Sequence, residues 1–158
     1  MRIKTPFAIS LVILAIAIAS IAGAFVFEAF GYAPCELCLK ERIPYFAAIP
    51  AAGLALVFST LGSRILLHTA FAALALIFAA SAVFGAYHAG VEWGFWPGPS
   101  ACAGALEHAF SAEDFLKQLE SVKVTRCDAP ALRILGLSLA GWNALISVLS
   151  AWLATLGM

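Results

Sequence analysis

Apolar residues gather in four blocks of roughly twenty positions, which is the length at which a helix crosses the hydrocarbon core of a bilayer. The blocks predict membrane-spanning helices over residues 6–29, 42–60, 65–88 and 133–156. Polar residues concentrate in two connections, a short one over 30–41 and a long one over 89–132. We therefore expect residues 1–158 to form a single all-α membrane domain, a four-transmembrane-helix bundle.

The first block carries no charge between Pro6 and Phe27, and Arg2 and Lys4 precede it. A cleaved signal peptide begins with the same basic residues, but its apolar region is only about 7–15 residues long. The longer block here favours a permanent membrane span.

Small residues recur at every fourth position in two of the blocks, a pattern that lets a neighbouring membrane helix approach closely. In the first block they are Ala15, Ala19 and Gly23. In the third block they are Ser81, Gly85 and Ala89. The sequence predicts close helix packing along both stripes.

The long connection contains one further helical pattern. Ser111 is a good N-cap residue, and acidic residues follow it in the first turn. Its apolar positions then share one helical face: Phe115, Leu116, Leu119 and Val122. We predict a short amphipathic helix that lies on the membrane surface.

The composition agrees with a membrane protein, because 63% of the residues are hydrophobic and only 11% are charged. The net charge is zero and no basic patch is present, which argues against nucleic-acid binding. The positive-inside rule leaves the orientation open, since each side of the predicted bundle carries three Lys or Arg residues near the helix ends.

A Cys-x-x-Cys pair, Cys35 and Cys38, lies at the head of the second block. A helix N-terminus and a nearby cation both lower the pKa of a thiol. Arg42 is four residues beyond Cys38 and shares its helical face, so Cys38 is the better thiolate candidate. The charge of Arg42 needs a partner near the hydrocarbon region. The candidate partners are the Cys38 thiolate, Glu41, a lipid phosphate and a bound cofactor. The alternative is that Arg42 only extends its side chain to the lipid headgroups.

A second pair, Cys102 and Cys127, lies in the long polar connection. It is either a structural staple, worth about 3–4 kcal/mol in the chain-entropy model, or a second redox pair that exchanges with the first. A four-cysteine zinc site is disfavoured because this pair lacks zinc-knuckle spacing, so we expect no metal. Stable disulfides need the oxidising side of the membrane. We therefore expect periplasmic cysteine loops and cytoplasmic termini.

Three histidines are present. His88 lies at the cysteine-bearing end of the third block, where it either hydrogen-bonds a cofactor carbonyl or is an ordinary interfacial side chain. His68 lies at the opposite end, and His108 has no motif around it.

Taken together, the arrangement resembles the disulfide-bond formation protein B (DsbB) family. The resemblance rests on Pro34-Cys35-x-x-Cys38-x-x-Glu41-Arg42 before the second span and on the cysteine pair before the fourth. It also rests on the run from Leu135 to Asn143 that opens the fourth span. It covers nearly the whole chain in order and spacing, although the Trp93–Pro99 run departs from the best-known members.

The resemblance implies a bacterial inner-membrane oxidoreductase that reoxidises a periplasmic DsbA-type dithiol oxidase and reduces ubiquinone or menaquinone. In that family the position of Cys102 is attacked by DsbA, and that of Cys127 exchanges with the position of Cys35. The thiolate at the position of Cys38 contacts the quinone. The residues that the resemblance implies around the quinone are Glu41, Arg42, His88, Leu139 and Trp142.

Redox energetics independently favour a quinone. DsbA lies at about −120 mV and a structural disulfide below about −300 mV, so an ordinary disulfide as the final acceptor would be uphill by about 8 kcal/mol. Two alternatives stay open at this point. One is a quinone reductase of the vitamin K epoxide reductase type, in which Cys-x-x-Cys comes late in the bundle. The other is a non-enzymatic membrane scaffold stapled by disulfides.

Overall fold

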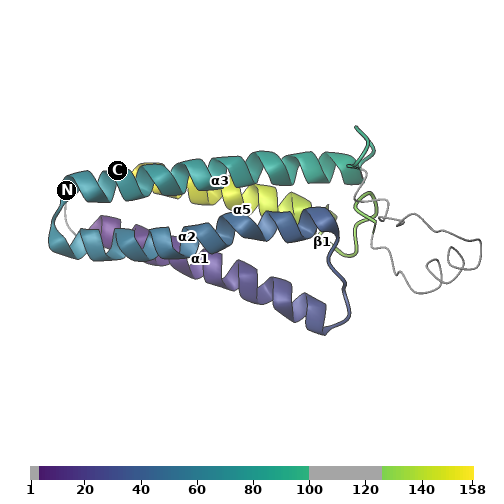
Figure 1. Cartoon of the computed structure of the whole chain (residues 1–158), viewed down its shortest axis with the longest axis horizontal. Coiled ribbons are helices and arrows are strands. Elements are labelled where there is room, and N and C mark those ends of the chain that lie inside the picture. Colours follow the sequence, from purple (N-terminus) through teal and green to yellow (C-terminus); the bar gives the residue numbers. More distant parts are fainter. Residues whose placement is uncertain (1–3, 100–125) are drawn as a thin grey trace, which may run out of the picture.

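The computed structural model describes residues 4–99 and 126–158, and it forms an elongated bundle of long helices (Figure 1). The helices are α1 (Lys4–Ala29), α2 (Glu36–Leu61), α3 (Arg64–Glu92) and α5 (Leu139–Gly157). All four are long and apolar enough to cross a membrane. The predicted all-α fold with four membrane-spanning helices is therefore confirmed. The amphipathic helix expected over residues 111–122 lies outside the described residues.

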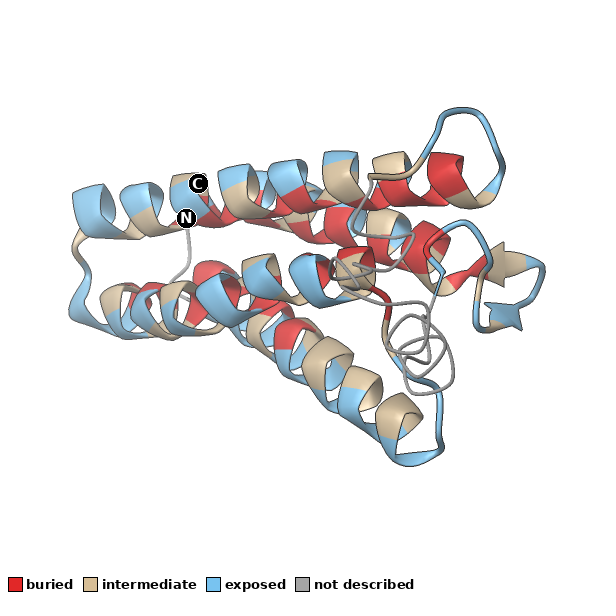
Figure 2. Cartoon of the chain, turned by 45° about the vertical axis from the view of Figure 1, so that its right-hand side comes forward, coloured by how far each residue is buried: buried red, intermediate tan, exposed pale blue. Residues whose placement is uncertain are grey.

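The helices pack as neighbouring antiparallel pairs, α1 on α2, α2 on α3 and α3 on α5. Gly62 ends α2 in the left-handed conformation, with φ 73°, and α3 begins two residues later. Both ends of the chain consequently lie at the end of the bundle opposite the start of α2 (Figure 1). Beyond its packed half, α1 diverges from α2 toward residue 29 (Figures 1 and 2).

Buried residues form the inward face of each helix and exposed residues form the outward face (Figure 2). On α2 the buried positions include Tyr45, Ala48, Ala52 and Ala55. They meet Phe71, Leu74 and Phe78 of α3 in the main core. The outward apolar side chains suit a lipid solvent, in which helices need satisfied backbone groups but no polar outer face.

A buried polar network ties three of the helices together. The Tyr45 hydroxyl of α2 donates to Asn143 Oδ1 of α5 at 2.6 Å. Ser147 of α5 donates to the Ser81 hydroxyl of α3 at 2.9 Å. Hydrogen bonds between membrane helices are worth about 0.6–2 kcal/mol each, so this network helps to fix the register of α2, α3 and α5.

Close helix packing was predicted along both small-residue stripes, and the structure shows it for only one of them. Ser81, Gly85 and Ala89 are buried, and a Cβ on Gly85 would lie 3.0 Å from the backbone nitrogen of Ala144 on α5. The close packing predicted for α3 is thus confirmed.

The prediction for α1 is wrong, because Ala15 and Ala19 are exposed and nothing lies within 4 Å of a Cβ built on Gly23. The buried face of α1 instead carries Ile13 and Ala17.

Three helix boundaries differ from the sequence expectation by four residues or more. The third span was expected to end at residue 88, but α3 continues to Glu92. The second span was expected from residue 42, but α2 begins at Glu36, because Cys35 caps the helix ahead of the apolar block. The fourth was expected from residue 133, but Arg133–Ile134 (β1) and Leu137–Ser138 (β2) pair as a small antiparallel hairpin. Leu135 and Gly136 form its turn with positive φ angles, and Ser138 then caps α5.

Candidate active site

Cys35 and Cys38 occupy the first turn of α2. Cys35 is the N-cap residue, and its Sγ accepts a hydrogen bond of 3.2 Å from the backbone N–H of Cys38. The two sulfurs are 2.6 Å apart, and both cysteines are free thiols. The unpaired N–H groups and the dipole of the helix N-terminus favour negative charge at this position. The turn is therefore built to hold a thiolate.

A histidine of α3 and a glutamate of α2 extend the site away from Cys35. His88 Nε2 lies 3.6 Å from Cys35 Sγ, and His88 Nδ1 lies 2.8 Å from Glu41 Oε1. His88 is only 1% exposed, and Glu41 is also buried. The three side chains form a continuous Cys–His–Glu series, in which the carboxylate orients the imidazole toward the sulfur.

These contacts make Cys35 the acidic thiol of the pair. Its pKa is lowered from 9.0 to about 4, chiefly by the Cys38 side-chain hydrogen bond and then by the hydrogen bond and charge of His88, against the opposing effect of burial. The expectation that Cys38 is the better thiolate is therefore not supported. Spacing placed Arg42 near Cys38, whereas the fold brings His88 to Cys35.

Cys127 joins the same region from the segment before the β1–β2 hairpin. It is 1% exposed and belongs to one buried cluster with Cys35, Leu37 and Val91, and Cys38 packs against that cluster. Cys127 is disulfide-bonded. Cys102 lies outside the described residues. Of the four predicted catalytic cysteines, the structure thus brings three together.

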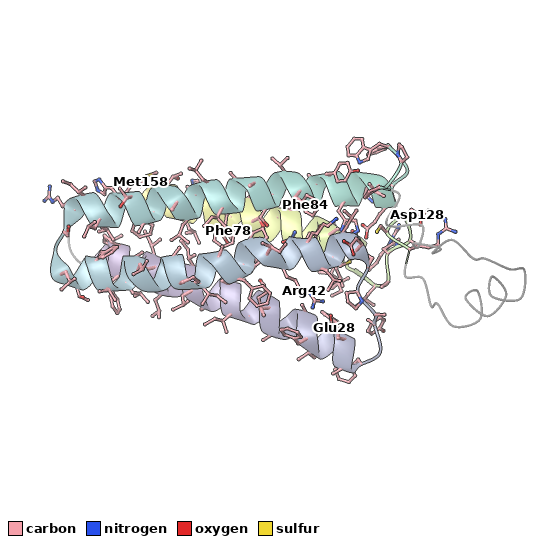
Figure 3. The ribbon with its side chains drawn as sticks, in the orientation of Figure 1. Glu28, Arg42, Phe78, Phe84, Asp128 and Met158 are labelled. Carbon is pink, nitrogen blue, oxygen red and sulfur yellow. The ribbon has the colours of Figure 1, made fainter. Side chains whose placement is uncertain are left out.

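Arg42 points away from this cluster and toward α1. Its Nη1 lies 2.6 Å from Glu28 Oε1, and its guanidinium stacks over the Phe25 ring at 5.5 Å from the centroid (Figure 3). The two ion-pair side chains are 14% and 29% exposed. Glu28 is therefore the partner that the Arg42 charge needs near the hydrocarbon region.

Two acidic residues of the site were missed by sequence reasoning. Glu28 is the first charge after the uncharged run of α1, and that isolation in an apolar helix was the available signal. Glu92 ends α3, and its Oε2 is buried without a hydrogen-bond partner among the described residues. The Glu92 carboxylate interacts electrostatically with His88 and Cys35. The site is consequently rich in groups that carry negative charge.

Residues 6–157 match the family described as Disulfide bond formation protein DsbB. The chain belongs to the DsbB family. It is also 28% identical over 143 residues to "Uncharacterized protein RP370" of Rickettsia prowazekii (strain Madrid E), and these residues cover 89% of this chain and 80% of that protein. No solved structure matches it significantly.

Membership in the DsbB family makes this chain a multi-pass membrane oxidoreductase of disulfide bond formation. Its dithiol and the adjacent, disulfide-bonded Cys127 are the groups that thiol–disulfide exchange requires, and His88 contacts the sulfur of Cys35. The scaffold alternative is thereby excluded. The remaining predicted residues, Leu139 and Trp142, lie in the first turn of α5, where the Trp142 indole donates to the Ile134 carbonyl at 3.0 Å.

Proposed function

We propose that this protein reoxidises a periplasmic DsbA-type dithiol oxidase and passes the two electrons to a membrane quinone. In the net reaction two thiols of the partner become a disulfide, and two electrons and two protons reach the acceptor. The observation that carries the proposal is the buried contact region shared by Cys35, Cys38 and Cys127. It would let the dithiol at the start of α2 exchange with a disulfide in a loop.

The exchange can be written with every sulfur accounted for. The partner reduces the Cys102–Cys127 disulfide, and the Cys127 thiolate attacks Cys35 of an oxidised Cys35–Cys38 pair, so that Cys38 leaves as a thiolate. Attack of Cys102 on Cys127 then restores the loop disulfide and releases Cys35. Because a leaving thiol of low pKa departs faster, the stabilised Cys35 thiolate favours this release. The reduced pair holds the two electrons.

The groups around the start of α2 fit a quinone. Cys38 is half-buried one turn before Arg42, whose N–H groups suit a carbonyl oxygen. Apolar side chains of α1 and α2 are exposed beside them, namely Phe25, Ile43 and Phe46. A bound ubiquinone or menaquinone supplies a lipid-soluble acceptor of two electrons and two protons. We propose Arg42 and its neighbours, with Leu139 and Trp142, as the residues that hold it.

The cysteine-bearing end would face the periplasm of a bacterial inner membrane, with both termini in the cytoplasm. The support is that α2 begins and α3 ends at one end of the bundle, away from the two termini (Figure 1). Persistent disulfides form only in an oxidising compartment.

The proposal is tested with the full chain in sealed vesicles of known orientation. Reduced DsbA added outside right-side-out vesicles should be oxidised, and a short-chain ubiquinone should be reduced in equal amount, as followed by quinone absorbance. Inside-out vesicles should show the activity only after permeabilisation. The His68→Gln variant, changed at an exposed residue of the opposite end, is the matched control. Thiol oxidation without quinone reduction would refute the electron path.

The Arg42–Glu28 pair gives a separate prediction about quinone affinity. Arg42→Ala should raise the KM for quinone about tenfold, since a hydrogen bond from a charged group is worth about 1.5–3 kcal/mol. Glu28→Gln should raise it less, because Arg42 keeps its charge but loses the contact that orients it. The rate of thiol exchange with DsbA, measured by stopped flow, should stay unchanged in both. Unaltered quinone kinetics would leave Arg42 with a purely structural role.

A further inference from the structure

Three metal-binding atoms converge at the head of α2. Cys35 Sγ, Cys38 Sγ and one ring nitrogen of His88 all lie within 4.8 Å of one another. Thiolate and imidazole are the ligands that Zn²⁺ prefers, and three protein ligands with one open position are typical of non-structural zinc sites. This Cys₂His cluster differs from the four-cysteine site that the sequence argued against.

The sulfur–nitrogen distance of this cluster already fits a tetrahedral zinc site, whereas the sulfur–sulfur distance is too short. Zinc–sulfur bonds of about 2.3 Å and zinc–nitrogen bonds of about 2.0–2.1 Å set a sulfur and a nitrogen ligand about 3.6 Å apart. Cys35 Sγ and His88 Nε2 are 3.6 Å apart. The two sulfurs, at 2.6 Å, must separate to about 3.8 Å. Cys38 is half-buried and free, so rotation of its side chain can supply this change.

Glu41 completes a feature that metal-binding histidines commonly have. A histidine ligand usually donates its other ring N–H to a carboxylate, which fixes the ring and raises its basicity. Here His88 Nδ1 is 2.8 Å from Glu41 Oε1, which leaves Nε2 directed at Cys35. This orientation exists before any metal arrives.

The surrounding charge also favours a cation. Glu41 and Glu92 are acidic, and both interact electrostatically with Cys35 and His88. Glu92 Oε2 is buried without a hydrogen-bond partner among residues 4–99 and 126–158. A divalent ion would compensate the two thiolates and this carboxylate together.

We propose that the reduced protein binds one thiophilic divalent cation of the Zn²⁺ type through Cys35, Cys38 and His88, with solvent in the fourth position. The metal replaces two protons, the one on Cys38 and the one shared between Cys35 and His88, and both pass to solvent. A Cys35–Cys38 disulfide removes two ligands, so only the dithiol form binds. Metal binding therefore holds the enzyme reduced and competes with exchange at Cys35. The proposal does not depend on the identity of the electron acceptor.

Cobalt(II) is the probe, because a cobalt–thiolate site absorbs in the near ultraviolet and a tetrahedral one absorbs strongly in the visible. The full chain with Cys102→Ser and Cys127→Ser, reduced with a phosphine in detergent, should bind one equivalent with both signals. Zn²⁺ should displace the cobalt and erase the spectrum. Oxidation of the same sample to the Cys35–Cys38 disulfide should release the metal, which tests the site without a further mutation.

Substitutions then assign the ligands. His88→Gln should weaken Co²⁺ binding at least tenfold, and Cys35→Ser should remove most of the thiolate absorption. Glu41→Gln should weaken binding about 10–100-fold, the usual effect of losing the partner of a ligand histidine. His68→Gln should change nothing. The proposal fails if the reduced protein develops no cobalt–thiolate absorption, if oxidised protein binds equally well, or if His88→Gln keeps the full affinity.

Discussion

Replacing Cys38 by serine is expected to lower quinone reduction at least about 1,000-fold, a loss of about 4 kcal/mol in transition-state stabilisation. Serine differs from cysteine by one atom, but it forms no disulfide and carries no electrons. Cys38 Sγ is the partner of Cys35 Sγ at 2.6 Å, so the substitution prevents the first pair from being oxidised. Turnover of a soluble ubiquinone with reduced DsbA measures the effect.

The same variant separates electron delivery from thiol exchange. Cys35 and Cys127 remain in one buried cluster, so in the Cys38→Ser protein the Cys35 thiolate should attack the Cys102–Cys127 disulfide at Cys127 and release Cys102 as a thiolate. The resulting Cys35–Cys127 bond should be visible as a shift on a non-reducing gel. Cys35→Ser should lose both the turnover and this linkage. Wild-type quinone reduction by the Cys38→Ser protein would overturn the proposed path.

The parts of the fold that composition determines were predictable. Uninterrupted apolar blocks predicted the membrane helices, because lipid imposes a length and an exclusion of charge that a sequence displays directly. Small residues alone did not determine which face packs inward. The stripe at Gly85 is packed against α5, whereas the similar stripe at Ala15 and Ala19 is exposed. The difference depends on where the neighbouring helix lies, which is long-range information.

The parts of the site that lie close together in the sequence were predictable, and their partners from other helices were not. The Cys-x-x-Cys pair and Arg42 are adjacent in the chain, and their spacing on a helix identified them. The partners of these residues come from other helices: His88 lies 53 positions from Cys35, and Glu28 belongs to α1. The sequence favoured Cys38 as the thiolate because only charges nearby in the chain, such as Arg42, could be taken into account. Packing of α3 against α2 supplies the imidazole that favours Cys35 instead.

The hairpin before α5 shows a local reason for error. Leu135, Leu137 and Leu139 are apolar, so the sequence predicted that the span begins among them. Leu135 and Gly136 instead adopt positive φ angles, which a helix does not contain. A two-residue turn of this kind joins antiparallel strands. The side chain of Ser138 accepts from the Gly141 N–H at 3.2 Å, which moves the helix start to residue 139.

Replacing His88 by glutamine is expected to shift the pH dependence of Cys35 reactivity upward. A thiol is nucleophilic as its thiolate, which exists above its pKa. The folded protein lowers the Cys35 pKa from 9.0 to about 4, so the wild-type rate should be flat from pH 5 to 8. Losing a hydrogen bond to a charged group costs about 1.5–3 kcal/mol, and 1.4 kcal/mol is about one pH unit. The midpoint should therefore rise by about 1–2 units.

Alkylation of Cys35 in the Cys102→Ser, Cys127→Ser protein, followed by mass spectrometry with a chelator present, measures this midpoint. The shift should be partial, because the hydrogen bonds from Cys38, the largest influence on Cys35, remain. Glu41→Gln should move the midpoint less far than His88→Gln does, because two effects oppose each other: His88 loses the carboxylate that orients it, and Cys35 loses a nearby negative charge. Glu92 makes no hydrogen bond to His88, so Glu92→Gln mainly removes a negative charge near the thiolate and should lower the midpoint. If His88 only supported the packing of α3 on α2, its loss would reduce the rate equally at every pH, and the midpoint would stay near 4.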